Sequence, residues 1–290
     1  MKFKLNIHDE FSSLKSVLVG IANDRGNIVH ENNPKISKYL QQGKIPSEST
    51  LVGQVDNFSN LLEEQGVKVF RPKNIPNQDQ IFTRDISFVI DDKIIKSKMK
   101  KENRKVEQEG IDFVFDKIYD ECLLTPPDNA YIEGGDVIVH KNYIFVGLSS
   151  RTNHTGYEFL RSSFPKYEVI PFQLFATDNP ATNILHLDCA LQTFGGKYAL
   201  IYEDGFVHYP DSIIDIIGDS NLVKVTQYEM YHMNPNIFSI APDKIVSDKS
   251  FKRINQIFYS LGIQTIEIDY QEVSKLGGLF RCSTLPLIRE

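Results

Sequence analysis

The sequence predicts an α/β fold in which a strand-turn-strand unit and a helix repeat along a chain of 290 residues. Three segments share a pattern of two apolar strands joined by a two-residue turn. An aspartate precedes the first strand of each, and these aspartates, Asp85, Asp136 and Asp188, recur about every fifty residues. A fixed period of that size is typical of an array or propeller of similar units.

The elements between the hairpins are predicted from apolar spacing. A strand over residues 14–21 is expected as a shorter relative of the repeated unit. A helix follows over residues 52–65, where apolar residues recur at helical spacing and Gly66 supplies a stop signal. Residues 156–163 and 249–261 have the same helical pattern, the latter with one continuous apolar face.

The hairpins themselves are predicted from their turn residues. Asp-Asp, Lys-Asn and Gly-Gly join the strands, and Gly-Gly is the strongest signal because positive φ costs glycine nothing. The strand pairs are residues 86–90 with 93–95, 137–140 with 143–146, and 189–194 with 197–202.

The composition argues against several functional classes. A net charge of −6 argues against a nucleic-acid groove, and the basic run 96–105, which contains Glu102, is interpreted as a mostly solvated segment. No apolar stretch approaches the length of a membrane span, which is about 18 residues or more. Lys2 and Lys4 without an apolar segment after them predict no signal peptide. We therefore expect no nucleic-acid partner and no membrane contact.

The cysteines indicate chemistry rather than disulfides. Three widely spaced cysteines form no disulfide framework, so a reducing, cytoplasmic location is expected. No metal-binding spacing is present, and no metal or cofactor is predicted. Cys122 and Cys189 are interpreted as structural. Cys282 lies between a Gly-Gly pair and a Ser-Thr-Leu-Pro segment, which suggests a loop thiol rather than a buried structural one.

Acidic residues and a histidine recur at the starts of the hairpins. If the repeated units circle an axis, the carboxylates of Asp85, Asp136 and Asp188 converge on one cavity. Such convergence is costly unless a cation fills the cavity. The alternative is that each aspartate merely caps a turn, but Glu133 and His186 beside them favour a functional site.

Taken together and in this order, the motifs resemble those of the guanidino-group-modifying enzymes: arginine deiminases, dimethylarginine dimethylaminohydrolases and amidinotransferases. The resemblance covers residues from about 14 to 289 and implies a five-fold pseudosymmetric α/β propeller of the pentein type, with residues 1–290 as a single catalytic domain. Family analogy also suggests a homodimer. The motifs are Phe-Thr-Arg-Asp at 82–85, Glu-Gly-Gly-Asp at 133–136, Gly-Leu-Ser-Ser-Arg-Thr-Asn at 147–153, and His-Leu-Asp at 186–188.

The resemblance implies a catalytic role for three residues. Cys282 matches the nucleophile, His186 the general acid and base, and Glu133 the carboxylate that orients the imidazole. For an isolated pattern, a core histidine would be the default interpretation of His186. With Asp188 two residues further, both side chains would share one face of a strand, which favours the catalytic role.

The resemblance also implies substrate-binding residues. Asp85 and Asp188 match the pair that holds the guanidinium, in the manner of bidentate ion pairing. Arg151 and, less closely, Arg104 match arginines that hold the substrate carboxylate. Asp136 either serves the site or holds the neighbouring Gly-Gly turn, and the sequence leaves both open.

These roles predict a hydrolase acting on a small guanidino compound through a covalent amidino-cysteine intermediate, with a ureido product and ammonia or an amine. Asp188 favours an unsubstituted guanidinium, as in arginine, because the dimethylarginine hydrolases usually lack an aspartate there. The helical insertion of full-length arginine deiminases is absent. An amidinotransferase is the alternative, since it would use the same residues. A binding protein without turnover is a third reading that the full set of residues disfavours.

Overall fold

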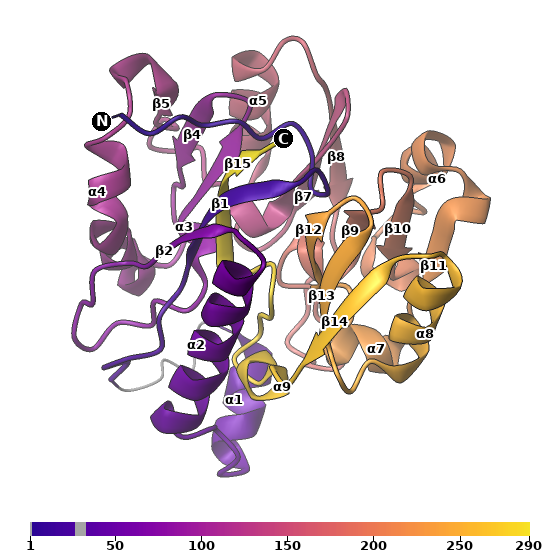
Figure 1. Ribbon diagram of the computed structural model, residues 1–290. Coiled ribbons are helices and arrows are strands. Elements are labelled where there is room, and N and C mark those ends of the chain that lie inside the picture. Colours follow the sequence, from indigo (N-terminus) through magenta and orange to yellow (C-terminus); the bar gives the residue numbers. More distant parts are fainter. Residues whose placement is uncertain (1, 27–32) are drawn as a thin grey trace.

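The computed structural model describes residues 2–26 and 33–290 and shows an α/β protein (Figure 1). The described residues contain five three-stranded sheets. In order along each sheet, their strands are β15 (Thr284–Arg289), β1 (Leu14–Val19) and β2 (Lys68–Phe70); β3 (Ser87–Ile90), β4 (Lys93–Lys96) and β5 (Leu123–Leu124); β6 (Val137–His140), β7 (Tyr143–Leu148) and β8 (Glu168–Gln173); β9 (Leu191–Phe194), β10 (Tyr198–Ile201) and β11 (Leu222–Lys224); β12 (Phe238–Ala241), β13 (Lys244–Asp248) and β14 (Gln264–Ile268).

All five sheets share one topology. The middle strand pairs antiparallel with one neighbour and parallel with the other. The three predicted hairpins are confirmed as β3–β4, β6–β7 and β9–β10. Their turns contain residues in the left-handed region, with φ of 55° at Asp91, 55° at Lys141, 61° at Gly195 and 76° at Gly196. Such turns match the twist of the flanking strands.

Two strand pairings differ from the sequence prediction. The strand near the N-terminus, β1, forms no hairpin of its own. It pairs antiparallel with β15 from the other end of the chain and parallel with β2. A further hairpin, β12–β13, was not predicted, because Pro242-Asp243 replaces the usual glycine or asparagine turn signal. Both findings extend the repeated unit to every sheet.

The predicted helices are confirmed with shifted ends. They are α2 (Glu48–Glu64), α5 (His154–Ser163) and α8 (Lys252–Ser260). The side chain of Ser47 accepts a hydrogen bond from the Thr50 N–H at the start of α2, and Gly66 follows its end with a φ of 80°. The remaining helices are α1 (Pro34–Gln41), α3 (Thr83–Ile86), α4 (Asp112–Phe115), α6 (Asp211–Ile217), α7 (Gln227–Tyr231) and α9 (Gln271–Ser274). In the described parts of the chain, no helix has the length and apolar character needed to cross a membrane.

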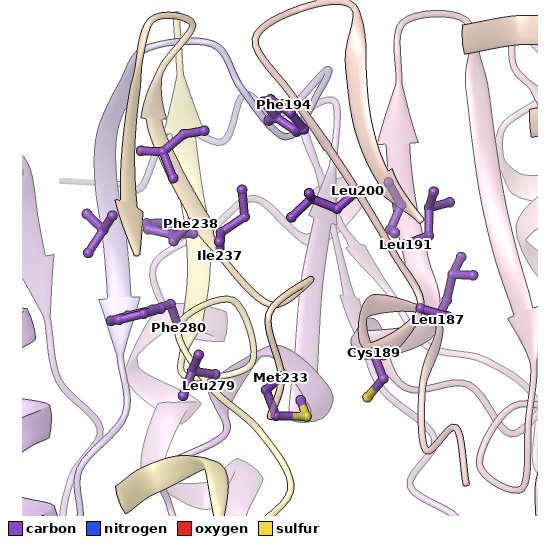
Figure 2. Close-up of a cluster of buried hydrophobic side chains, with 14 of the residues drawn as sticks. Leu187, Cys189, Leu191, Phe194, Leu200, Met233, Ile237, Phe238, Leu279 and Phe280 are labelled. Atoms are coloured by element: carbon purple, nitrogen blue, oxygen red, sulfur yellow. The ribbon is translucent and has the colours of Figure 1, made fainter. Parts of the chain in front are cut away.

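Short 3₁₀ helices in the segments between strands carry residues of interest. They include η2 (Glu102–Ile111), η4 (Gly134–Asp136) and η5 (Leu187–Cys189). Figure 2 shows how η5 and the loop before β15 are anchored. Leu187 and Cys189 of η5, together with Leu279 and Phe280 of that loop, belong to one cluster of buried apolar side chains. Burying one such leucine or phenylalanine contributes about 2 kcal/mol. The cluster therefore fixes both segments, and Cys189 lies in it as a structural residue would.

Candidate active site

A small cavity brings together candidate side chains from five of the segments that connect the strands. Its volume is about 30 Å³, and Asp85, Arg104, Arg151, His186 and Cys282 are among its lining residues. All five are candidates that the sequence motifs indicate for the site. The other three candidates are completely buried and do not line this cavity: Glu133, Asp136 and Asp188.

Cys282 is buried, with 3% of its surface exposed, and it lies against the cavity. The expectation of an open loop thiol is therefore corrected. Its Sγ–H donates to Asp188 Oδ2 at 3.4 Å, and Sγ accepts from the Asn236 amide at 3.2 Å. Burial, then the carboxylates of Asp188 and Asp85, raise the pKa of the Cys282 thiol well above its ordinary value. Without a ligand, the sulfur is a thiol at neutral pH.

His186 faces the same cavity as a cation. Its Nε2–H donates to Glu133 Oε2 at 3.0 Å, and its Nδ1 lies 3.6 Å from Asp85 Oδ1. Burial lowers the pKa of His186, but the carboxylates of Asp85, Asp136 and Glu133 outweigh burial and raise that pKa to about 9. For Glu133, burial acts in the opposite direction and raises the pKa. The hydrogen bond with His186 and the charge of Arg151 outweigh burial and lower the pKa of Glu133 to about 2. The pair is an imidazolium and a carboxylate at neutral pH.

Asp188 lies behind Cys282 rather than in the cavity wall. Its Oδ2 accepts from Arg281 Nη1 at 2.9 Å, so a protein cation already balances its charge. The prediction that His186 and Asp188 share one face of a strand is wrong, because His186 has extended backbone while Asp188 lies in the 3₁₀ helix η5. The turn of η5 directs His186 to the cavity and Asp188 to the sulfur.

Asp136 supports the histidine segment. Its Oδ1 accepts from the Leu187 N–H at 2.9 Å, and its Oδ2 accepts from the Ser149 hydroxyl at 2.6 Å. Burial raises the pKa of Asp136 to about 7, although His186 and the Ser149 hydrogen bond act against the shift. The sequence left open whether Asp136 serves the site or holds the neighbouring turn. Its contacts favour a role in holding the local chain, because it binds the backbone of Leu187, the residue that follows His186.

The two candidate arginines are buried and in contact with carboxylates. Arg104 Nη1 lies 2.8 Å from Asp85 Oδ2, and the rest of its guanidinium binds Glu107 at 2.8 and 2.9 Å. Arg151 Nη1 donates to Glu133 Oε2 at 3.4 Å. The interpretation of the basic run as solvated therefore fails at Arg104, which is 7% exposed. These guanidiniums supply positive charge for the converging carboxylates.

Comparison with known proteins identifies the family. The profile described as "N,N dimethylarginine dimethylhydrolase, eukaryotic" matches residues 28–289. The chain belongs to this dimethylarginine dimethylhydrolase family.

Relatives extend the assignment to the wider group. The chain is 35% identical over 214 residues to the uncharacterized protein YkgA of Bacillus subtilis, covering 73% of this chain and 70% of that protein. It is 25% identical over 278 residues to an arginine deiminase of Borreliella afzelii, covering 82% and 67%. An amidinotransferase from Microseira wollei, which acts in the saxitoxin biosynthetic pathway, superposes with a TM-score of 0.80 at 17% identity, over 99% and 97% of the two chains. This dimethylhydrolase family member is thus one of the guanidino-group-modifying proteins and shares their α/β fold.

The sequence analysis of this family member missed Asn236. Its side-chain oxygen accepts from the backbone N–H groups of Leu279 and Cys282 at 3.2 and 3.1 Å, while its amide donates to the sulfur. Asn236 precedes β12 as Asp85 precedes β3. The spacing of about fifty residues, extended past Asp188, would have found it.

Arg281 was also missed. It is completely buried, with 0% of its surface accessible to solvent. Its guanidinium binds both Asp188 and Glu10 at 2.9 Å. No pattern in the sequence separates it from an ordinary loop arginine, because its partners come from distant segments.

Three of the buried groups have the geometry of a cation site. One ligand atom from each of Asp85, Glu133 and His186 lies within 4.8 Å of the others. Arg104 and Arg151 already contact the two carboxylates. The donor set therefore fits a guanidinium at least as well as a metal ion, which would have to bind beside two protein cations.

Proposed function

We propose that the protein hydrolyses the guanidino group of arginine or a close derivative. The observation that carries the proposal is that a thiol, an imidazolium and a carboxylate face one small cavity, from Cys282, His186 and Asp85. Family membership supports the substrate class, because the relatives are named for reactions at guanidino groups.

In the first step, the substrate guanidinium binds Asp85, displacing the contact that Arg104 makes there. The added positive charge lowers the pKa of the Cys282 thiol, so the thiol releases its proton to bulk water and the thiolate remains. Sγ then attacks the guanidino carbon, forming an S–C bond and a tetrahedral centre. Asp188, 3.4 Å from Sγ and behind it, orients the sulfur for this attack.

In the second step, the C–N bond breaks. The imidazolium of His186 donates its proton to the departing nitrogen, which leaves as ammonia or an amine. An amidino-thioether remains on Cys282. Neutral His186 then takes a proton from water, the hydroxide adds to the amidino carbon, and the C–S bond breaks to release a ureido product such as citrulline. Glu133 keeps the imidazole oriented throughout.

The rest of the proposal concerns binding and organisation. Arg151 and Arg104 hold the substrate carboxylate once the guanidinium has bound Asp85, and the reaction needs no cofactor.

We further propose that the five sheets circle a pseudo-five-fold axis and that residues 1–290 act as one catalytic domain. We also propose that the protein works in the cytoplasm, as a homodimer. The common sheet topology supports the circular arrangement.

An amidinotransferase is the second candidate, favoured by the similarity to the Microseira wollei enzyme over nearly the whole chain. An amine would replace water in the last step, and the same residues would serve. Ornithine formation from arginine, measured with and without glycine, separates the reactions: transfer requires the acceptor, whereas hydrolysis to citrulline does not.

The main test is a substrate panel with product identification by mass spectrometry. Arginine, methylated arginines, agmatine and guanidinoacetate are incubated with the protein and with its Cys282→Ser variant. We expect a ureido product from the wild type and none from the variant, with both folded by circular dichroism. Cys122→Ser, at the partly exposed free cysteine, is the matched control and should keep activity. Equal product release by Cys282→Ser would refute the mechanism.

A further inference from the structure

A second, larger cavity adjoins the catalytic one. Its volume is about 1020 Å³, against about 30 Å³ for the inner cavity. The two share Asn33, Arg151 and Leu185 as lining residues, so the larger cavity, here termed the vestibule, lies next to the proposed carboxylate-binding arginine. A volume of this size lies at the upper end of the range for small-molecule sites, and arginine alone would leave much of it empty.

The vestibule is strongly cationic. Lys38, Lys100 and Lys101 line it together with Arg151, and Asp178 is the acidic residue among the lining residues. Across the described ranges 2–26 and 33–290, no carboxylate forms an ion pair with any of these three lysines. Such a concentration of like charge is unfavourable in the empty protein.

Neighbouring lysines of the same basic run behave differently. Lys96 lies 3.9 Å from Asp112, Lys98 2.7 Å from Asp128, and Lys105 2.6 Å from Glu102. The chain as a whole carries a net charge of −6, so acidic partners are abundant. Within the basic run 96–105, the two lysines that form no ion pair with a described carboxylate, Lys100 and Lys101, are therefore the two that line the vestibule, which is the arrangement that attracts and holds an anion.

The substrate's own carboxylate does not account for this charge, because Arg104 and Arg151 of the inner cavity are assigned to it. We propose that the preferred substrate is an arginine whose α-nitrogen carries an acidic acyl or peptidyl group, and that the vestibule lysines bind that second anion. This inference rests on the proposed function and specifies its substrate class. The guanidino end enters the inner cavity, and the acidic substituent extends from the α-nitrogen past Arg151 into the vestibule.

The test uses substrates of similar size and different charge. N-acetylated Glu-Arg, Gln-Arg and Lys-Arg dipeptides and free arginine are compared by kcat/KM for formation of the ureido product. We expect kcat/KM for Glu-Arg to exceed that for Gln-Arg by at least about fivefold, because several exposed charge pairs together supply that much binding energy. Lys-Arg should have the lowest kcat/KM. The preference should shrink in 0.5 M salt, which is about three times physiological ionic strength and shortens the Debye length below its physiological value of about 8 Å. Equal kcat/KM for the three dipeptides would overturn the proposal.

Two double variants isolate the vestibule charge. Lys100→Gln with Lys101→Gln removes two vestibule lysines, and Lys98→Gln with Lys105→Gln removes two paired lysines outside it, with the same change in net charge. We expect the first pair to reduce the Glu-Arg to Gln-Arg ratio of kcat/KM by about threefold or more, and the second pair to leave it unchanged. Equal loss in both would indicate a long-range charge effect and refute a vestibule site.

The outcomes also separate this inference from the proposed function. If arginine compounds are hydrolysed without any preference for the acidic dipeptide, the proposed function holds and the vestibule site fails. If no guanidino compound is hydrolysed, the proposed function fails. Calorimetric titration of the Cys282→Ser protein with the dipeptides then tests separately whether the vestibule binds the acidic group. Tighter binding of the Glu-Arg dipeptide would support the site, and equal or absent binding would refute it.

Discussion

The thiol of Cys282 is surrounded by negative charge, which is an unusual setting for a nucleophile. Reactive cysteines usually have a lowered pKa because a cation lies near them. Here the carboxylates of Asp188 and Asp85 face the sulfur, and burial adds to their effect. The amide of Asn236 donates a hydrogen bond to the sulfur, which favours a thiolate. The free protein is therefore protected from adventitious reaction, and the substrate cation activates it.

This setting predicts slow, strongly pH-dependent alkylation of Cys282 in the free protein. With iodoacetamide, the rate at Cys282 should still be rising steeply at pH 9, because the thiol pKa lies well above its ordinary value. Mass spectrometry of the peptides measures this rate, with the partly exposed Cys122 as the internal reference. A rate at Cys282 that levels off below pH 8 would contradict the raised pKa, since restricted access of the reagent alone slows alkylation equally at every pH.

Asn236→Ala is predicted to lower kcat by about 10- to 100-fold with a smaller change in KM. The substitution removes two acceptor contacts that fix the loop carrying Cys282 and one donor contact to its sulfur, so the nucleophile is displaced from the guanidino carbon. Steady-state kinetics measures both constants. Asn221→Ala, at a partly buried asparagine whose amide donates to the carbonyl of Ile217 at the end of α6, is the control and should keep kcat. A change confined to KM would instead assign Asn236 to substrate binding.

The inner cavity could be predicted from the sequence to the extent that its residues belong to compact motifs. Cys282, His186 and Asp85 each lie in a short recognisable segment, and the structure brings them together. Asn236 escaped because an asparagine lacks the acid-base chemistry that drew attention to the aspartates. Arg281 escaped because its role depends on burial, and a sequence does not show which arginine is enclosed.

At the scale of elements, five side chains of the site come from short segments that precede one outer strand of each sheet. The segments before β3, β6, β9, β12 and β15 carry Asp85, Asp136, Asp188, Asn236 and Cys282 respectively. Alternating apolar strands and turn residues made three of the hairpins predictable. The pairing of β1 with β15 was not predictable in the same way, because it joins residues at opposite ends of the chain and no turn connects them.

Close packing between these turns predicts that Gly135→Ala disrupts the site. A Cβ at Gly135 would lie 2.7 Å from His186 Nδ1 and 3.0 Å from Asp85 Oδ1, so the imidazole must move. We expect kcat to fall about 100-fold and stability to fall by about 1–3 kcal/mol. Kinetics and denaturant unfolding measure the two effects.

The control for that substitution is Gly53→Ala in the interior of α2, where a Cβ meets nothing within 4 Å. It should raise stability by about 0.5–1 kcal/mol, because alanine favours the helix, and leave kcat unchanged. Full activity in Gly135→Ala would show that the histidine segment has more freedom than the packing allows.

At the scale of the whole molecule, one buried guanidinium links several sheets. Arg281, in the loop before β15, binds Asp188 before β9, the carbonyl of Val137 in β6 at 2.7 Å, and Glu10 in the segment before β1. A buried charge is costly to leave unpaired, so these partners must assemble together. The same contact holds Asp188 beside the sulfur. The geometry of the site is therefore coupled to the assembly of the sheets around it.

This coupling predicts a specific loss of stability in acid, which depends on Glu10. Burial raises the pKa of Glu10, but the charges of Arg281 and Arg84 outweigh it and lower that pKa from 4.5 to about 2. A lowered pKa stabilises the folded protein above pH 4.5, and the contribution is lost as the pH falls through about 2. The shift corresponds to about 3 kcal/mol at neutral pH. Glu10→Gln should therefore be less stable than the wild type by up to this amount at pH 7, measured by urea unfolding. The difference should shrink toward pH 2, as the wild-type carboxylate becomes protonated; a difference that stays constant from pH 7 to pH 2 would show that Glu10 stabilises the fold by packing and not by its charge.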